Sequence, residues 1–365
     1  MKYFFMTLIV LHAIIHIIGF SKAFNLMSFI PSTTSISRFT GVLWLLAFLL
    51  LFLSGILYWL KTDAWWLISL IAISLSQYLI ISNWADARFG TIPNGLILFI
   101  TLFQFFQWKF HRTYTREVNE LLLEKSIHSD ELLLEKDIQH LPELVKKYIH
   151  YTGSLGKPKI KNFHVLFSGG IRKNENSEWM QHHTEQYSSL LSGTRLFFMT
   201  AVMKKLPIAG YHRYKNGHAK MDIKLFSLFK VQYQDGPLMD ISESVTFLND
   251  ICLMAPAALI QPIFSWGQAE GNTVEVFLSL HGIKVSAWLY FNDQGQLKDF
   301  VSGDRYAYQG KDQMKKIKWS TPVYKYGEFN GYRLCSEAGA IYHYSTNPLT
   351  YATFRISQLE YNVRE

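Results

Sequence analysis

The sequence predicts an all-α transmembrane four-helix module followed by an α+β domain, in which an antiparallel, strongly curved sheet wraps around a central helix. Two observations lead to this fold class. Only eight charged side chains lie among the first 110 of the 365 residues, about 7% of that stretch, which is typical of membrane proteins. From Lys159 onward, runs of alternating apolar and polar residues are separated by dipeptides that favour hairpin turns.

The membrane module is expected to cover residues 1–110. Its few charges separate four uncharged stretches, and each stretch is long enough as a helix to cross about 30 Å of hydrocarbon. Two histidines in the first stretch, and the lack of a convincing cleavage site before Lys22, favour a retained span over a signal peptide. The four stretches are residues 3–21, 39–60, 64–85 and 89–108.

The flanking lysines and arginines indicate the orientation of the module. If the N-terminus lies inside, more bases flank the inner ends of the spans than the outer ends. This predicts a multi-pass protein of the inner (cytoplasmic) membrane with its soluble domain in the cytoplasm, although loss of the first span would reverse the sides. The inner bases are Lys2, Lys61, Lys109, Arg112 and Arg116, and the outer ones are Lys22, Arg38 and Arg88.

The net charge of +8 is shared equally between residues 1–110 and the rest of the chain. Half of the excess therefore flanks the membrane, and the other half is spread thinly over a large domain. Such a distribution indicates membrane lipids as partners and does not favour nucleic acid.

Residues 111–140 are expected to form a charged helical linker. They contain a short repeat, Glu-Leu-Leu-Leu-Glu-Lys, at positions 120–125 and again at 131–136. An amphipathic helix or helical hairpin near the membrane is the favoured interpretation, and a homodimer through a coiled coil of residues 112–140 is the alternative. A further helix from Glu143 to His150 then opens the soluble domain, residues 141–365.

Hairpin turns and one apolar helix define the soluble domain. The run from Ile283 to Phe291 alternates in the way of a strand with one buried face. The segment from Ser242 to Ala255 instead has apolar residues at helical spacing, and Pro256 is well placed to start another helix. A sheet must cover its apolar face, so we expect it to curve around this helix. The turn dipeptides are Asn216-Gly217, Asp235-Gly236, Glu270-Gly271, His281-Gly282, Gln294-Gly295 and Asn330-Gly331.

Several strings carry a family resemblance. They are Leu141–Tyr148, Leu248–Leu259, Ser302–Tyr306, Trp319–Pro322 and Gly331–Arg333. Together they resemble an uncharacterised bacterial family of membrane-attached proteins, a domain of unknown function that corresponds here to residues 141–363. The strings at 11–20 and 86–92 resemble a four-helix module sometimes joined to it. The resemblance implies an architecture and no activity. By fold analogy alone, the topology is similar to the half-barrel of bacterial lipoprotein carriers, which hold acyl chains between sheet and helix.

Common catalytic motifs are absent from the sequence. It contains no phosphate-binding loop, dinucleotide-binding glycine motif, nucleophile elbow or zinc-protease motif. The pair His182-His183 is interpreted as ordinary strand residues, and Asp304-Arg305 as an ion pair. The two cysteines, Cys252 and Cys335, provide no disulfide framework. We therefore predict no catalytic residue, no metal site and no cofactor.

An intramembrane polar cluster is expected in the module. His12 and His16 are four residues apart and share one helix face. Asp86 and Arg88 flank the third and fourth spans on the side toward which His16 lies. Interhelical hydrogen bonds are the favoured role, and a proton or metal site is the alternative.

The aromatic and methionine content of the soluble domain fits either a filled core or an apolar cavity between the sheet and the helix at 243–263. In the second case, arginines near the mouth would meet a polar headgroup. The leading hypothesis is a non-enzymatic domain that binds a lipid or another hydrophobic small molecule. The alternatives are an enzyme acting on a membrane-borne substrate, through Asp304, Arg305 and histidines 182–183 or 343, and a membrane assembly or sensor protein. The candidate ligand-binding residues are Arg195, Tyr211, Arg213, Trp266, Trp288 and Arg305.

Overall fold

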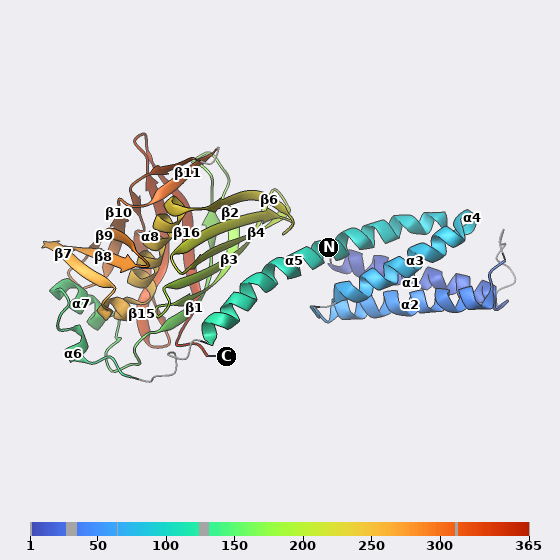
Figure 1. Cartoon of the computed structure of the whole chain (residues 1–365), viewed down its shortest axis with the longest axis horizontal. Coiled ribbons are helices and arrows are strands. Elements are labelled where there is room, and N and C mark those ends of the chain that lie inside the picture. Colours follow the sequence, from blue (N-terminus) through green and yellow to red (C-terminus); the bar gives the residue numbers. More distant parts are fainter. Residues whose placement is uncertain (1, 27–34, 64, 124–130, 311–312, 365) are drawn as a thin grey trace. The chain divides into compact units, whose positions relative to one another are not determined.

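The structure is a computed structural model that describes residues 2–26, 35–63, 65–123, 131–310 and 313–364. The chain divides into two compact units, Met1–Phe110 and His111–Glu365. Figure 1 shows the elements of both.

The first unit is helical. Four helical segments are long and apolar enough to cross a membrane, namely Tyr3–Ala23, Arg38–Trp59, Trp65–Ser82 and Trp84–Leu122, and they correspond to the four predicted spans. The helices pack closely where glycines allow it, since a Cβ on Gly19 would lie 2.4 Å from the Trp44 ring. The elements are α1 (Lys2–Ala23), α2 (Arg38–Trp59), α3 (Trp65–Ser82), α4 (Trp84–Ala87), η1 (Arg88–Gly90) and the first part of α5 (Thr91–Leu122).

The second unit combines short helices, one long helix and many strands. The helices are α6 (Glu135–Ile138), α7 (Glu143–Tyr151), α8 (Pro237–Met254) and η3 (Pro256–Ile260). The strands before α8 are β1 (Asn162–Ile171), β2 (Met180–Ser189), β3 (Thr194–Met203), β4 (Leu206–Lys215), β5 (His218–Leu225) and β6 (Phe229–Asp235). Those after it are β7 (Phe264–Glu270), β8 (Thr273–Leu280), β9 (Ile283–Phe291), β10 (Leu297–Ser302), β11 (Tyr306–Gly310), β12 (Gln313–Lys316), β13 (Trp319–Ser320), β14 (Val323–Phe329), β15 (Tyr332–His343) and β16 (Pro348–Tyr361).

One large antiparallel sheet dominates this unit. Its strand order is β6-β5-β4-β3-β2-β1-β16-β15-β13-β10-β9-β8-β7, with β14 paired to β15, while β11 and β12 form a separate hairpin. Helix α8 contacts β4, β5 and β6 near one edge and β8, β9 and β10 near the other. Since strands from both halves reach the same helix, the sheet bends around it (Figure 1). The predicted α+β class is confirmed.

The pairing register separates an inner face of the sheet, toward α8, from an outer face. Phe197 of β3 pairs with Gln186 of β2 and His212 of β4, and these three side chains face inward. Phe198, the next residue, pairs with Glu185 and Tyr211 on the outer face. A change of one residue therefore moves a side chain to the opposite face.

The start of α8 differs from the prediction. Asp235-Gly236 is not a hairpin turn, because Gly236 precedes the helix with a φ of 91° and Pro237 occupies the first turn. The helix therefore begins five residues before Ser242. The other five turn dipeptides lie where one strand ends and the next one follows, and Pro256 starts η3 as predicted.

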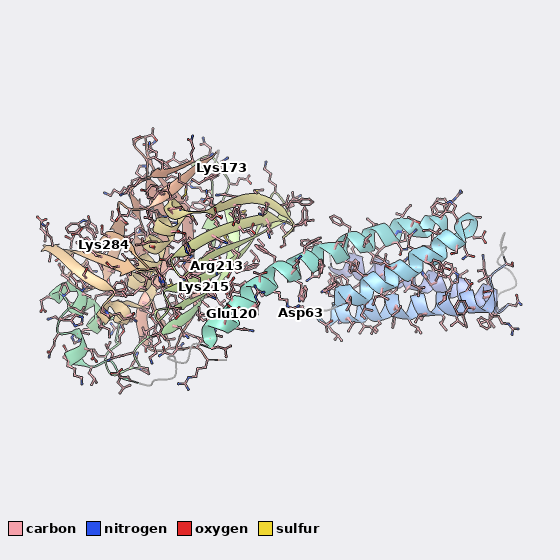
Figure 2. All side chains as sticks on the ribbon, in the orientation of Figure 1. Asp63, Glu120, Lys173, Arg213, Lys215 and Lys284 are labelled. Atoms are coloured by element: carbon pink, nitrogen blue, oxygen red, sulfur yellow. The ribbon has the colours of Figure 1, made fainter. Side chains whose placement is uncertain are left out.

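Residues 111–122 of α5 pack on the outer face of β3 and β4. The Tyr114 ring lies 5.3 Å from that of Phe198 and 5.6 Å from that of Tyr211. Figure 2 shows Glu120 beside Arg213 and Lys215, and the Glu120 carboxylate lies 2.9 Å from the Lys215 ammonium. The first part of the expected linker is thus docked on the sheet.

The homodimer is expected to form through residues 112–140. Residues 124–130, which include the end of the first repeat copy, lie outside the described residues. The apolar side chains of Tyr114, Val118 and Leu121 are already buried within this unit. The homodimer stays a prediction.

Candidate functional site

A charged network lies on the inner face of the sheet, under α8. The guanidinium Nη1 of Arg195 on β3 donates to the Glu243 carboxylate at 3.2 Å, and its Nε donates to Asp250 at 2.7 Å. Nη2 of Arg305 lies 3.9 Å from the other oxygen of Glu243. Gln186 donates to Asp250 at 2.8 Å. Glu243, on α8, therefore lies between two arginines, and the network pairs two positive charges with two negative ones.

Arg305 is held by several further groups. Its Nη1 donates to the Ser242 carbonyl at 2.9 Å and to the Thr246 hydroxyl. The guanidinium lies 4.4 Å from the Trp319 ring centroid, and its Nε donates to the Tyr342 hydroxyl at 3.3 Å. All four side chains of the charged network are largely buried, with exposed fractions of 12% for Arg305, 10% for Asp250, 7% for Arg195 and 3% for Glu243.

Burial and charge set the protonation states here. Burial acts to raise the pKa of Glu243, but the guanidinium groups of Arg195 and Arg305 outweigh it and hold that pKa below its ordinary value. Burial lowers the pKa of His212, which faces the same interior, to about 4. At neutral pH Glu243 is therefore ionised between the two guanidinium groups, and the His212 imidazole is neutral.

An apolar surface continues the inner face beyond this network. Helix α8 is hydrogen-bonded to one end of β4 and β5. The Asp240 carboxylate accepts from the Ala219 amide, and the Ser244 and Tyr214 hydroxyls are hydrogen-bonded to each other. Toward the other end, the inner residues of β3, β4 and β5 include Met199, Ile208 and Ile223. Gly210 lies between Met199 and Ile223 in the register. Met199 and Ile208 are buried and Ile223 is half-buried, so a packed apolar layer adjoins the charged end.

The six candidate ligand-binding residues do not form one site. Arg195 and Arg305 meet at Glu243, as described. Tyr211 and Arg213 lie on the outer face and donate to the same Glu117 oxygen of α5, at 3.1 Å and 2.6 Å. The register turns both side chains away from α8, so Arg213 does not lie beside Arg195 and Arg305.

The two tryptophans are also separate from the charged network. Trp266 pairs with Val276 at the β7 edge and packs partly buried against the core. Trp288 lies between Ala287 and Leu289, which are both buried, so its side chain points to the opposite face of β9.

In the membrane unit, four polar side chains form a hydrogen-bonded cluster. His16 Nδ1 donates to the His12 carbonyl at 2.8 Å, so its Nε2 accepts from the Ser76 hydroxyl at 2.8 Å. The Asn94 amide donates to Ser76 at 2.9 Å and accepts from His12 Nε2 at 2.8 Å. His12 Nδ1 is left as a buried acceptor without a partner among the described residues. The cluster joins α1, α3 and α5.

Asp86 and Arg88, the other two predicted members of the intramembrane cluster, have neighbours of their own. Asp86 lies 3.6 Å from the Lys22 ammonium, and the Arg88 guanidinium lies 5.1 Å from the Phe89 ring centroid. The partners that sequence reasoning missed are Ser76 and Asn94, and the amide of Asn94 within an apolar span was the feature that could have indicated them.

The residues of the enzyme alternative have separate partners. Asp304 accepts from the Ser286 amide at 2.9 Å and pairs with Lys316. The His343 and Ser320 side chains are hydrogen-bonded at 2.8 Å, and His182 bonds to Thr184 on its own strand. Among the described residues, no three His, Cys, Asp or Glu side chains are placed to hold a metal ion. Cys252 and Cys335 are both buried and free.

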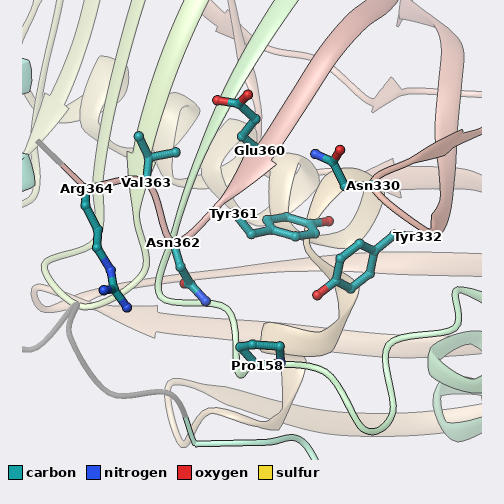
Figure 3. Close-up of a pocket in the computed structure, with 8 residues that line it drawn as sticks. All are labelled: Pro158, Asn330, Tyr332, Glu360, Tyr361, Asn362, Val363 and Arg364. Atoms are coloured by element: carbon teal, nitrogen blue, oxygen red, sulfur yellow. The ribbon is translucent and has the colours of Figure 1, made fainter.

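An open pocket of about 460 Å³ lies elsewhere on the domain (Figure 3). It adjoins the end of β16 and the β14–β15 turn, and the Tyr332 and Tyr361 rings meet in it edge to face at 4.8 Å. None of the predicted site residues contributes to it. Its lining is Pro158, Asn330, Tyr332, Glu360, Tyr361, Asn362, Val363 and Arg364.

Comparison with known proteins identifies the family to which the sheet domain belongs. No curated protein matches the chain. A putative outer membrane lipoprotein-sorting protein domain from Vibrio parahaemolyticus is 10% identical, with 55% of this chain and 85% of that chain covered and a TM-score of 0.32. A DUF1329 family protein from Desulfovibrio piger is 11% identical, with coverage of 60% and 91% and a TM-score of 0.33. The family of unknown function DUF6544 matches residues 131–354, which confirms the expected uncharacterised family. The chain belongs to the family of unknown function DUF6544.

Proposed function

We propose that this membrane protein uses its sheet domain to bind a lipid or another hydrophobic ligand, and that it does so without catalysing a reaction. The observation that supports this is the charged network at the end of an apolar inner surface. A ligand with an apolar chain and a polar head matches that arrangement. The chain would lie along Met199, Ile208 and Ile223, and the head would meet Arg305, whose side chain is the most open of the charged network.

The energetics of burial support a role beyond folding. Taking charges out of water is costly, and well-packed apolar residues often replace a buried ion pair without loss of stability. A domain that needed only a core would therefore gain little from two arginines and two carboxylates under α8. Recognition of a polar headgroup at the end of an apolar layer would, in contrast, require these charges.

The protonation states favour binding over proton transfer. Both carboxylates are paired with guanidinium groups, and burial keeps His212 neutral at pH 7. A general base needs a pKa near the working pH and reach to the substrate. The charged network instead offers fixed charges that orient a headgroup.

Ligand extraction from the purified full-length protein tests the proposal. Mass spectrometry should find a copurifying lipid, and a fluorescent fatty acid should bind saturably to the detergent-solubilised chain. Ile208→Trp would fill the inner surface and is expected to weaken binding by about tenfold or more. His183→Trp places the same side chain on the exposed outer face and serves as the control. Absence of both a lipid and saturable binding would refute the proposal.

We also propose that the spans lie in the inner membrane with the sheet domain in the cytoplasm, as the flanking bases favour. Two reporters fused after residue 365 test the sidedness. A fluorescent protein should be active and a periplasmic phosphatase inactive. The reverse result would place the domain outside.

A further inference from the structure

Two hairpins end side by side at one end of the sheet. The β3–β4 hairpin turns at Lys204-Lys205, and the β5–β6 hairpin turns after Leu225 at Phe226-Ser227. Leu225 pairs with Ile208, and the Phe226 amide donates to the Pro207 carbonyl at 3.0 Å. The two turns therefore form one continuous tip.

This tip carries exposed apolar and basic side chains together. The exposed fraction reaches 60% for Val202 and 61% for Phe229, although large apolar side chains are usually covered. Lysines stand among them at both hairpins. We define the hairpin tip surface as Val202, Met203, Lys204, Lys205, Leu206, Leu228, Phe229 and Lys230, all exposed.

The turn residues are a poor choice for folding alone. Lys204, Lys205, Phe226 and Ser227 all have positive φ, between 48° and 68°. Side chains other than glycine and asparagine disfavour this region, and Asn-Gly is the usual choice for such turns. At the opposite end of β4, the turn is Asn216-Gly217. The exposed lysines at the strained positions 204 and 205 therefore suggest a use beyond folding.

The chain also enters the domain from this side. The His111 ring lies 5.0 Å from that of Phe198, whereas Glu120 pairs with Lys215 at the far end of β4. The N-terminal end of this docked segment is therefore the one nearer the tip. The last predicted span ends at residue 108, and three residues reach no more than about 11 Å. The hairpin tip surface therefore lies toward the end of the domain at which the chain enters it.

We propose that the hairpin tip surface docks on the bilayer that the chain spans. Met203, Leu228 and Phe229 insert between the lipid headgroups, and the lysines contact anionic phosphates. Apolar side chains flanked by lysine match both layers of a membrane surface. The docking needs no ligand at the charged network. Failure of the proposed ligand binding would therefore leave the docking proposal intact, and failure of the docking would leave the ligand-binding proposal intact. A protein partner or a second copy, paired along the exposed edge strand β6, is the competing outcome.

A position-specific fluorescent label tests the docking. Full-length protein carrying Met203→Cys is labelled with a polarity-sensitive dye and reconstituted into vesicles of one third phosphatidylglycerol and two thirds phosphatidylethanolamine. The native cysteines are buried, and unsubstituted protein measures any labelling of them. Nitroxide lipids should quench the dye about twofold or more. The same dye at Lys220→Cys, exposed near the other end of β5, should stay unquenched.

Charge and partner controls complete the test. Lys204→Glu with Lys205→Glu should abolish the extra quenching that anionic vesicles give over phosphatidylcholine vesicles, while the unfolding transition is retained. Equal quenching at positions 203 and 220 would overturn the proposal. The proposal would also be overturned if the fluorescence of the dye at position 203 showed shielding from water in detergent and changed with protein concentration. That result would assign the tip to contact with a second copy.

Discussion

The two buried polar clusters of this protein hold helices in opposite ways. Under α8, Arg195, Glu243 and Arg305 are fully charged, and each charge has an opposite partner. In the membrane unit, His12 and Asn94 belong to a cluster joined by hydrogen bonds between neutral groups. Removing a single partner should therefore cost the sheet domain several kcal/mol of stability, whereas a substitution in the membrane cluster should lose only hydrogen bonds of modest worth.

The sharpest test of this difference removes the shared carboxylate. Glu243→Gln removes the carboxylate that lies between Arg195 and Arg305, and leaves Asp250 as the acidic partner of Arg195. We expect the free energy of unfolding to fall by about 3–5 kcal/mol, as for other broken buried pairs. Denaturant titration followed by tryptophan fluorescence measures it. Glu337→Gln, which removes a more open partner of Lys325 and Arg355, should cost far less. Equal losses of unfolding free energy in the two variants would show that burial of the ion pair makes no difference.

Acid should weaken the sheet domain through His212. Its pKa is about 4 in the folded chain and about 6.5 when unfolded. Between these values the unfolded chain binds the extra proton, so the stability contribution present above pH 6.5 is lost as the pH falls toward 4. In His212→Phe, unfolding midpoints should depend less on pH in this window. The exposed His183→Phe is the control, and an unchanged pH dependence in His212→Phe would exclude this histidine as the cause.

In the membrane unit the effects should be smaller. Asn94→Ala removes the group that His12, Ser76 and Gln77 share. We expect a loss of about 1–2 kcal/mol, because membrane hydrogen bonds are modest. Unfolding in mixed detergent micelles measures it. Ser74→Ala, whose exposed hydroxyl bonds only to its own helix, provides the matched control, and a loss as large as that of Glu243→Gln would contradict the comparison.

The smallest effect should be a gain in stability. Replacing Lys204-Lys205 by Asn-Gly suits the positive φ of this turn and should raise the free energy of unfolding by about 1 kcal/mol. The same change should weaken anionic-lipid dependence at the hairpin tip surface. A variant that is less stable would show that the lysines contribute to folding instead.

Large-scale features followed from simple patterns in the sequence. Charges mark the ends of the four spans because hydrocarbon excludes them. The run Ile283–Phe291 became β9, since its alternation matches one buried face. By contrast, the β3–β4 hairpin has no turn residue to mark it, because Lys204-Lys205 is atypical for a turn.

The candidate site was harder to predict for a geometric reason. Tyr214 and Arg195 face α8, while the neighbouring Arg213 faces α5. Alternation separates the two faces but does not say which one is covered by which helix. That choice depends on contacts between segments almost 100 residues apart, such as Glu117 with Arg213.

The pairing of β1 with β16 has a consequence for biogenesis. Phe163 pairs with Tyr361, so the strands that join the two halves of the sheet are about 200 residues apart in the chain. The membrane spans leave the ribosome first, and the early strands must then wait beside the bilayer with an open edge. Such intermediates are slow to complete and prone to wrong pairing. The sheet can therefore close only after β16 has been synthesised.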